Sequence, residues 1–364
     1  MPKNKPIELG SLITVQDIQG WYLDNPVLPS KAEQAFPLVQ SDQKTWKTLS
    51  NSSLLVNEAA DPISLNSKVP VAGRPGYKDV LGEMVSFGKG REMTADAIEK
   101  FEELKAKFTE LNNPAVAQQL LDYYGDDLRF VRTAMRAEMS YLSWALISAA
   151  CEIGFVTANS PYMQGITAMD YSVESWQKDA VATTWANSAA QILDDIASAL
   201  ALGDTHSKSF MEITMNQTWF NHVRNNTQVQ SYTATFVQSL LSTQSPPTLA
   251  QINQMLAQYF DFPVVINVVD EKVTRSSIAD VKTTVNPFSN GVAVFSQVKQ
   301  LGHFEWNGIH IIDPSRETYE DFYLIGNYKE IDPSYSKIYA KGRGFPVIDT
   351  YADNFYLKLD TIAW

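Results

Sequence analysis

The feature that most constrains the fold is an apolar stripe of helical spacing between Asp126 and Ile153. Its members recur at intervals of three or four residues, which is the period of one face of an α-helix. They are Leu128, Val131, Met135, Met139, Leu142, Leu146 and Ala149. At about 1.5 Å per residue, roughly 28 residues give a rod of about 40 Å, more than twice the average helix length. We therefore predict a long spine helix that ends at Gly154.

The segment before the spine has too few apolar residues to form a core of its own. From Asp61 to Lys89, proline and glycine residues separate short strand-like pairs such as Val85 and Phe87. This pattern predicts a long two-stranded excursion that lies on another surface. Met93 and Thr94 then open a helix, and Asn113-Pro114 should end it and begin the next.

The first sixty residues show no sustained period of either 2 or 3.6. Two interpretations stay open for them: an extended arm that becomes ordered on another molecule, or an ordinary segment wrapped on its own core.

The second half of the chain alternates short helices and strands. We predict a helix that ends at Gly203 and whose inward-facing residues are Ala189, Ile192, Leu193, Ile196 and Leu200. We also predict a capping box formed by Thr248 and Gln251. Other predicted elements are strands at 210–214, 264–269, 345–349 and 354–360, and helices at 216–225 and 232–241. Asn290-Gly291 and Asn307-Gly308 predict tight turns, the second within a hairpin.

No constellation of residues indicates catalysis or metal binding. The single Cys151 lies among apolar neighbours and is expected to be buried and inert. The four histidines lack further ligands at suitable spacing, and two Gly- and Lys-rich segments, 88–91 and 341–344, are interpreted as cationic turns. We therefore expect no catalytic residue, no cofactor and no metal.

Charge and hydropathy exclude further classes. Lys and Arg number 29 against 41 Asp and Glu, a net charge of −12, so the chain as a whole has no electrostatic basis for gripping DNA. We also expect no segment that spans a membrane.

Several segments, taken in order, resemble the HK97-type fold of tailed-phage major capsid proteins, in particular the branch typified by the phage lambda major head protein. They are PGYKDVLGEM, DDLRFVRTAMRAEMSYLSWAL, MNQTWFNHVRNN, NPFSNGVAVF with LGHFEW, and FPVIDTYADNFYLKL. The resemblance covers most of the chain from about residue 60 onward. It implies an α+β fold with an N-terminal arm (1–60), an extended loop or E-loop (61–93), a peripheral domain with the spine helix (94–199), an axial domain (200–335) and returning C-terminal strands (336–364).

This resemblance also implies a function. Copies of the chain would assemble as hexamers and pentamers into an icosahedral head that contains double-stranded DNA without binding it specifically. Implied partners are the chain itself, portal and scaffold proteins and decoration proteins; the implied locations are the virion and, during assembly, the host cytoplasm. The E-loop residues expected to contact a neighbouring subunit are Arg74, Tyr77, Lys78, Val80, Leu81, Glu83, Val85 and Phe87.

Three alternatives remain open at this point. An encapsulin-like compartment shell would have the same architecture and a different cargo. A carbohydrate-active enzyme would use the aromatic-rich C-terminal half, but it needs a convergent carboxylate pair that the sequence does not indicate. A tail or decoration protein would lack the spine helix.

Overall fold

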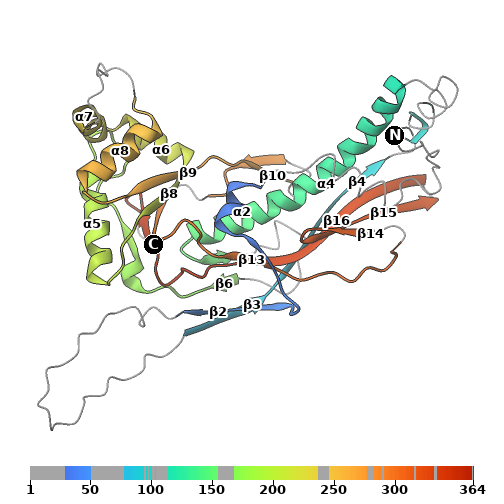
Figure 1. Ribbon diagram of the computed structural model, residues 1–364, viewed down its shortest axis with the longest axis horizontal. Helices are drawn as coiled ribbons and strands as arrows, with labels where there is room; N and C mark the ends of the chain where they lie inside the picture. Colours follow the sequence, from blue (N-terminus) through green and yellow to red (C-terminus); the bar gives the residue numbers. More distant parts are fainter. Residues whose placement is uncertain are drawn as a thin grey trace, which may run out of the picture.

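The computed structural model describes residues 29–50, 78–93, 96, 98–100, 103, 114–154, 168–236, 246–276, 282–288, 291–314, 317–331, 334–362 and 364. The described part is elongated, with a lobe of helices and short strands at one end and the long helix over a sheet at the other (Figure 1). The predicted helix that opens at Met93-Thr94 lies largely outside the described residues.

A six-stranded sheet lies beneath the long helix. Its strands follow the order β1 (Leu38–Gln40), β13 (His303–Trp306), β16 (Ser334–Val347), β15 (Tyr323–Ile331) and β14 (Glu317–Glu320), and β4 (Val85–Met93) also pairs with β16. Ile325, Ile338 and Ala340 are buried on this sheet, while Lys341 alternates to the exposed side. This period of two fits a sheet with one buried face.

The spine prediction is confirmed, although the helix is longer than predicted and ends earlier. Helix α4 runs from Pro114 to Ser148, 35 residues, so it starts at the Asn113-Pro114 boundary. The predicted stop at Gly154 was wrong, because the chain already turns at Ala150 and Cys151, whose φ angles are 53° and 61°. Gly154 instead lies in the short strand β5 (Glu152–Gly154), which pairs with β6 (Ala168–Asp170).

The lobe at the other end is built on a five-stranded sheet (Figure 1). Its strands follow the order β7 (Lys178–Ala180), β17 (Phe355–Lys358), β12 (Val292–Ser296), β8 (Glu212–Asn216) and β9 (Val265–Val269). Around it lie the 3-10 turn η3 (Ser175–Gln177) and helices α5 (Ile192–Thr205), α6 (Gln217–Asn225), α7 (Thr227–Phe236) and α8 (Leu249–Tyr259). The predicted C-terminal strand is therefore confirmed as an internal strand of a sheet.

Of the helix ends predicted in this lobe, the start of α8 is confirmed and the end of α5 is off by two residues. Thr248 and Gln251 form the predicted capping box at the start of α8. Gly203, predicted to close α5, lies inside the helix, which ends two residues later at Thr205. Its role is steric, because a Cβ atom there would lie 2.5 Å from the ring of Phe210. Helix α7 begins five residues before the predicted helix at 232–241, of which 237–241 lie outside the described residues.

The Asn-Gly prediction failed at Asn307-Gly308. Strand β13 precedes this pair, but it is hydrogen-bonded to β16, which lies about forty residues later, and residues 307–311 form no strand. Asn307 donates from its side chain to the carbonyl of Ser41 over 2.8 Å, and its backbone N–H donates to the carbonyl of Arg343. Asn290 lies outside the described residues. Gly291 has a φ of 82° before β12, as expected of a turn, but β12 pairs with β8 and β17.

Two antiparallel ribbons complete the described architecture. One consists of β2 (Thr45–Ser50) and β3 (Lys78–Glu83), and the other of β10 (Val273–Ser276) and β11 (Lys282–Val285). Figure 1 shows the first of them at the lower edge of the molecule, below the six-stranded sheet.

Residues 29–50 lie on their own chain. Ser30 caps the short helix α2 (Lys31–Ala35), and Phe36 is fully buried, with its ring 6.0 Å from that of Trp144 in the spine. For this stretch the second interpretation of the N-terminal segment holds. Residues 1–28 lie outside the described residues.

Buried side chains form two hydrophobic clusters. The first joins α2, the spine and the six-stranded sheet, and the second fills the lobe around α5, α8 and β8. Strands β12 and β17 contribute to both, since Val294 and Tyr356 belong to the first cluster and Ala293 and Phe355 to the second. Strands β13, β14 and β15, which the sequence analysis placed within segment 200–335, lie in the sheet under the spine.

Candidate assembly surfaces

The β2–β3 ribbon is held at its base by a stack of aromatic rings. Trp46 lies between Tyr171 and Phe345, with ring centroids 5.4 Å apart on both sides and interplanar angles of 16° and 6°. Val80 on the partner strand is also buried. One face of the ribbon is therefore fixed to the body of the subunit.

The opposite face of the ribbon points to solvent. Leu81 is 68% exposed, and Glu83, two residues along the same strand, is exposed on the same face. Lys47 lies directly across from Leu81 in the antiparallel register. An exposed leucine between charged neighbours on a projecting ribbon is a surface suited to a protein partner.

The structure divides the eight predicted E-loop residues into three groups. Arg74 and Tyr77 lie outside the described residues. Lys78, Val80, Leu81 and Glu83 lie in the ribbon. Val85 and Phe87 begin β4, which pairs with β16 of the same chain; Val85 is buried, and the ring of Phe87 lies 6.4 Å from that of Phe304.

Exposed apolar side chains occur both in the lobe and at the end formed by the spine and the six-stranded sheet. Besides Leu81 they are Val39, Phe130, Met211, Tyr232, Val265, Val285, Val298, Ile312, Tyr319, Tyr328, Ile362 and Trp364. Ile312, in the loop after β13, is the most exposed of them at 86%. Such a distribution offers several separate contact areas rather than a single one.

The two segments interpreted as cationic turns are neighbouring strands, so that interpretation was wrong. Residues 88–91 lie in β4 and residues 341–344 in β16, with Lys341 opposite Gly88. A Cβ atom at Gly88 would lie 2.9 Å from the carbonyl oxygen of Ala340, which explains the glycine. Arg91 pairs with Asp127 over 3.1 Å.

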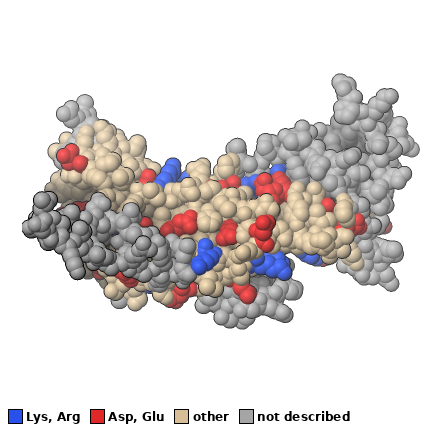
Figure 2. Space-filling view, turned by 60° about the horizontal axis from the view of Figure 1, so that its bottom comes forward, with Lys and Arg blue, Asp and Glu red and all other residues tan. Residues whose placement is uncertain are grey.

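On the face shown in Figure 2, acidic and basic side chains lie next to one another. Among the described residues of that face, this mixture gives no broad area of one sign for a polyanion.

Cys151 and His206, two side chains capable of chemistry, make structural contacts. Cys151 is fully buried beside the hydroxyl of Tyr356 at 2.8 Å, and burial raises the pKa of its thiol to about 12. This confirms the expectation of a buried cysteine, and a raised pKa leaves little of the reactive thiolate at neutral pH. The ring of His206 stacks on Trp176 at 4.0 Å. Within the described ranges, no group of three or more His, Cys, Asp or Glu residues could hold a metal ion.

His303 is the histidine with the clearest electrostatic partner. Its Nδ1 lies 2.7 Å from Asp349, and this hydrogen bond, together with the charges of Asp349 and Glu305, raises the pKa of the imidazole above 6.5 in spite of burial. A raised pKa in the folded state stabilises the fold at pH values below the unfolded-state pKa, and the contribution disappears as pH rises through the folded-state value.

We therefore predict a pH-dependent stability that comes from this pair. Between pH 6 and pH 8, wild type should lose about 0.5–1 kcal/mol more unfolding free energy than Asp349→Asn, a modest value because both side chains are partly exposed. Urea unfolding of the two proteins at both pH values measures the difference. Equal losses would show that His303 does not titrate against Asp349.

Comparison with solved structures identifies the fold. The chain is similar to the putative capsid protein of a prophage from Escherichia coli CFT073, with a TM-score of 0.57, 11% identity, and coverage of 95% of this chain and 99% of that one. The chain has an HK97-type capsid fold. Lower similarity is found to a phage-related protein from Bordetella bronchiseptica RB50 (TM-score 0.48, 10% identity, 95% and 97% coverage) and to the capsid of a native GTA particle (0.46, 10%, 93% and 93%). No protein-family model matches the sequence, and neither does any curated protein.

The order of spine, mixed lobe and return strand agrees with the prediction, but the ribbon does not. Its strand β3 pairs with β2, which precedes the predicted excursion of 61–89, and Val85 and Phe87 lie in β4 instead. The sequence analysis missed the anchoring residue of the ribbon, Trp46, because its partners Tyr171 and Phe345 are distant in sequence. It also missed the boundary at Met84, where β3 of the ribbon ends and β4 of the six-stranded sheet begins. The signal was present, because Met84 and Val85 are adjacent apolar residues, both buried, and so break the alternation of inward and outward residues along a strand. No helix in the described part of the chain combines the length and the apolar character needed to cross a bilayer.

Proposed function

We propose that this protein is a major capsid protein that assembles, as hexamers and pentamers, into an icosahedral shell around double-stranded DNA. The observation that carries the proposal is the capsid fold over nearly the full length of the chain, at 95% coverage. Exposed apolar side chains at both ends of an elongated subunit support it, because each copy in a closed shell contacts several neighbours.

In this proposal the ribbon is the intersubunit element. Its inner face is fixed to its own subunit by Trp46, while Leu81 on the outer face is free to pack on a neighbour. Arg74, Tyr77, Lys78 and Glu83 are proposed to contact the neighbour together with Leu81, whereas Val80 is buried on the inner face. Val85 and Phe87 fix the end of the ribbon to the six-stranded sheet. The proposed axial domain is the lobe around α5 to α8, and the proposed peripheral domain is the spine with its sheet.

The remaining parts of the proposal concern partners and location. The shell contains DNA without gripping it, in keeping with the net charge of −12. Portal, scaffold and decoration proteins are its further partners, the virion is its final location, and assembly takes place in the host cytoplasm. The protein has a structural role and no enzymatic one. Its place near the phage lambda branch rests on the sequence motifs.

Electron microscopy of the purified full-length protein tests the class of function. Shells, tubes or capsomer rings are the expected result. A protein that stays monodisperse and monomeric under all assembly conditions would contradict the proposal, and particles that contain protein cargo without DNA in the native host would favour a compartment shell.

Leu81→Asp tests the proposed role of the ribbon. Because the side chain is 68% exposed, the thermal midpoint of the unassembled subunit should stay within about one degree of wild type, whereas the yield of particles should fall at least about tenfold. Thr283→Asp, at an exposed polar position on the other ribbon, is the control and should assemble like wild type. Sedimentation of assembly mixtures measures the yield, and normal particles from Leu81→Asp would contradict this role.

A further inference from the structure

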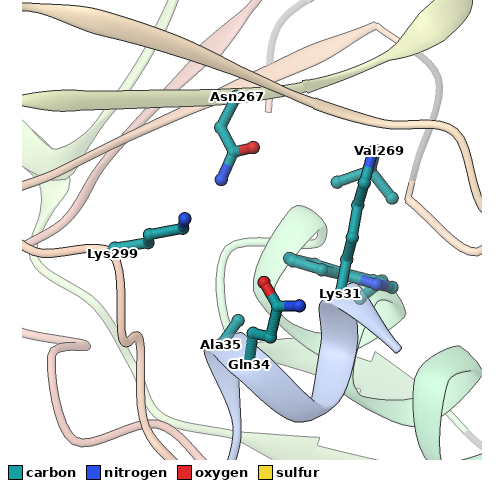
Figure 3. A pocket seen from close by; sticks show the side chains of 7 residues that line it. Lys31, Gln34, Ala35, Asn267, Val269 and Lys299 are labelled. Carbon is teal, nitrogen blue, oxygen red and sulfur yellow. The ribbon is translucent and has the colours of Figure 1, made fainter. Parts of the chain in front are cut away.

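A small pocket lies where the two hydrophobic clusters meet. Helix α2, strand β9, the spine and the loop after β12 surround it, and its volume is about 120 Å³. The floor is apolar and consists of Ala35, Trp144 and Val269. Three polar side chains, Gln34, Asn267 and Lys299, point into the same space from different elements (Figure 3).

These three side chains have no partner of their own. In the ranges that the structure describes, the amides of Gln34 and Asn267 and the ammonium of Lys299 make no hydrogen bond or ion pair. Lys299 interacts at longer range with Glu212. Burial raises the pKa of the Glu212 carboxyl, and the positive charge of Lys299 offsets part of that rise. Gln34 and Lys299 are exposed in the single subunit, so the ammonium at the pocket faces solvent and has no hydrogen-bonded counter-ion among the described residues.

The fourth polar group at the pocket, Lys31, is already occupied. Its ammonium donates to Asp270 over 2.6 Å and to the carbonyl of Val268 over 3.0 Å. The pocket thus offers one available positive charge and two carboxamides that can donate N–H groups. This set matches a carboxylate, which carries one charge, better than a phosphate dianion. The apolar floor suits the short aliphatic stem of an aspartate or glutamate.

An exposed apolar patch lies directly beside the pocket. Val265 donates from its backbone to the carbonyl of Met211, Met211 donates to Ser296, and Ser296 donates from its hydroxyl to the carbonyl of Val298. Met211, Val265 and Val298 are 42%, 38% and 47% exposed. Val265 lies on the same face of β9 as the pocket residues Asn267 and Val269, and Val298 precedes Lys299 in the chain, so the patch adjoins the pocket.

We propose that this pocket receives an acidic side chain from a second copy of the chain, and that apolar residues of that copy pack on Met211, Val265 and Val298. A polar anchor enclosed by apolar contacts is the usual form of a protein interface. A second copy is the matching occupant because the chain carries 41 acidic residues against 29 basic ones, so each copy presents an excess of carboxylates. The inference rests on the proposed function, in which many copies assemble.

Lys299→Glu is the first test. It replaces the free ammonium with a carboxylate, so the incoming acidic group meets a like charge, and the protein concentration needed for assembly should rise at least about tenfold. Lys282→Glu makes the same charge change at an exposed position of β11, away from the pocket lining, and should assemble like wild type. Light scattering during assembly measures the threshold concentration.

Asn267→Asp provides a second variant of almost unchanged shape. It places a carboxylate inside the pocket beside Lys299, where it competes with the neighbour's acid, so this variant should also show a raised threshold with an unchanged circular dichroism spectrum. Wild-type thresholds for both pocket variants would overturn the pocket inference alone. Failure of wild type itself to associate would overturn both this inference and the proposed function.

Discussion

Replacing Arg132 by methionine should lower the free energy of unfolding of the subunit by about 3–5 kcal/mol. Arg132 lies on the buried side of the spine, with its side chain 4% exposed, and its Nε and Nη2 atoms both donate to Glu320, whose side chain is 12% exposed. Tyr323 also donates to this carboxylate, over 3.0 Å. Without the arginine, an enclosed carboxylate loses its counter-ion, and this unpaired charge is the main cost. Urea unfolding of the unassembled full-length subunit gives the value.

Two comparison variants separate this effect from other losses. Arg129→Met removes an arginine from the same helix, but its side chain is 65% exposed and pairs with Asp126 at 3.4 Å, so the change should stay within about 0.5 kcal/mol. The double variant Arg132→Met with Glu320→Leu removes both charges and should recover most of the lost stability. A double variant as unstable as Arg132→Met would show that packing, and not the charge, is responsible.

The elements that the sequence could predict are those specified by nearby residues. The spine was visible because its buried residues recur with a helical period, and the start of α8 was visible because Thr248 and Gln251 cap each other within one turn. The end of the spine was harder to predict, since Ala150 and Cys151 adopt positive φ without being glycines. Both are fully buried, so tertiary packing sets the turn there and overrides the local preference.

Pairing between distant strands could not be read from the sequence. Asn307-Gly308 has the composition of a hairpin turn, yet β13 pairs with β16, where Phe304 faces Pro346 and Glu305 faces Phe345. Burial of Phe304 and Phe345 in one cluster favours this pairing. The same limit applies to the assembly surfaces: Leu81 lies in a segment recognised as an excursion, whereas the pocket combines residues from α2, α4, β9 and the loop after β12 and has no local pattern.

The arrangement of ribbon and body leads to the second large prediction, at Trp46. This side chain is 1% exposed between Tyr171 and Phe345, so Trp46→Ala should lower the unfolding free energy by about 3–5 kcal/mol through the cavity it leaves. It should also release the base of the ribbon, and β2 and β3 should become sensitive to limited proteolysis while the spine stays resistant. Urea unfolding and mass spectrometry of the proteolytic fragments measure the two effects.

Trp46→Phe shows whether the stack itself holds the ribbon. A phenyl ring can remain between Tyr171 and Phe345, and the substitution removes an indole N–H that is buried without a hydrogen-bond partner among the described residues. The loss of contact area is therefore partly offset, and this variant should cost less than half as much as Trp46→Ala and should keep the ribbon resistant. Equal proteolysis of both variants would mean that the stack does not fix the ribbon. If Trp46→Phe keeps the ribbon resistant to proteolysis and assembles normally, the aromatic stack inside the subunit sets the position of the outer face of the ribbon, where Leu81 is proposed to meet the neighbouring subunit.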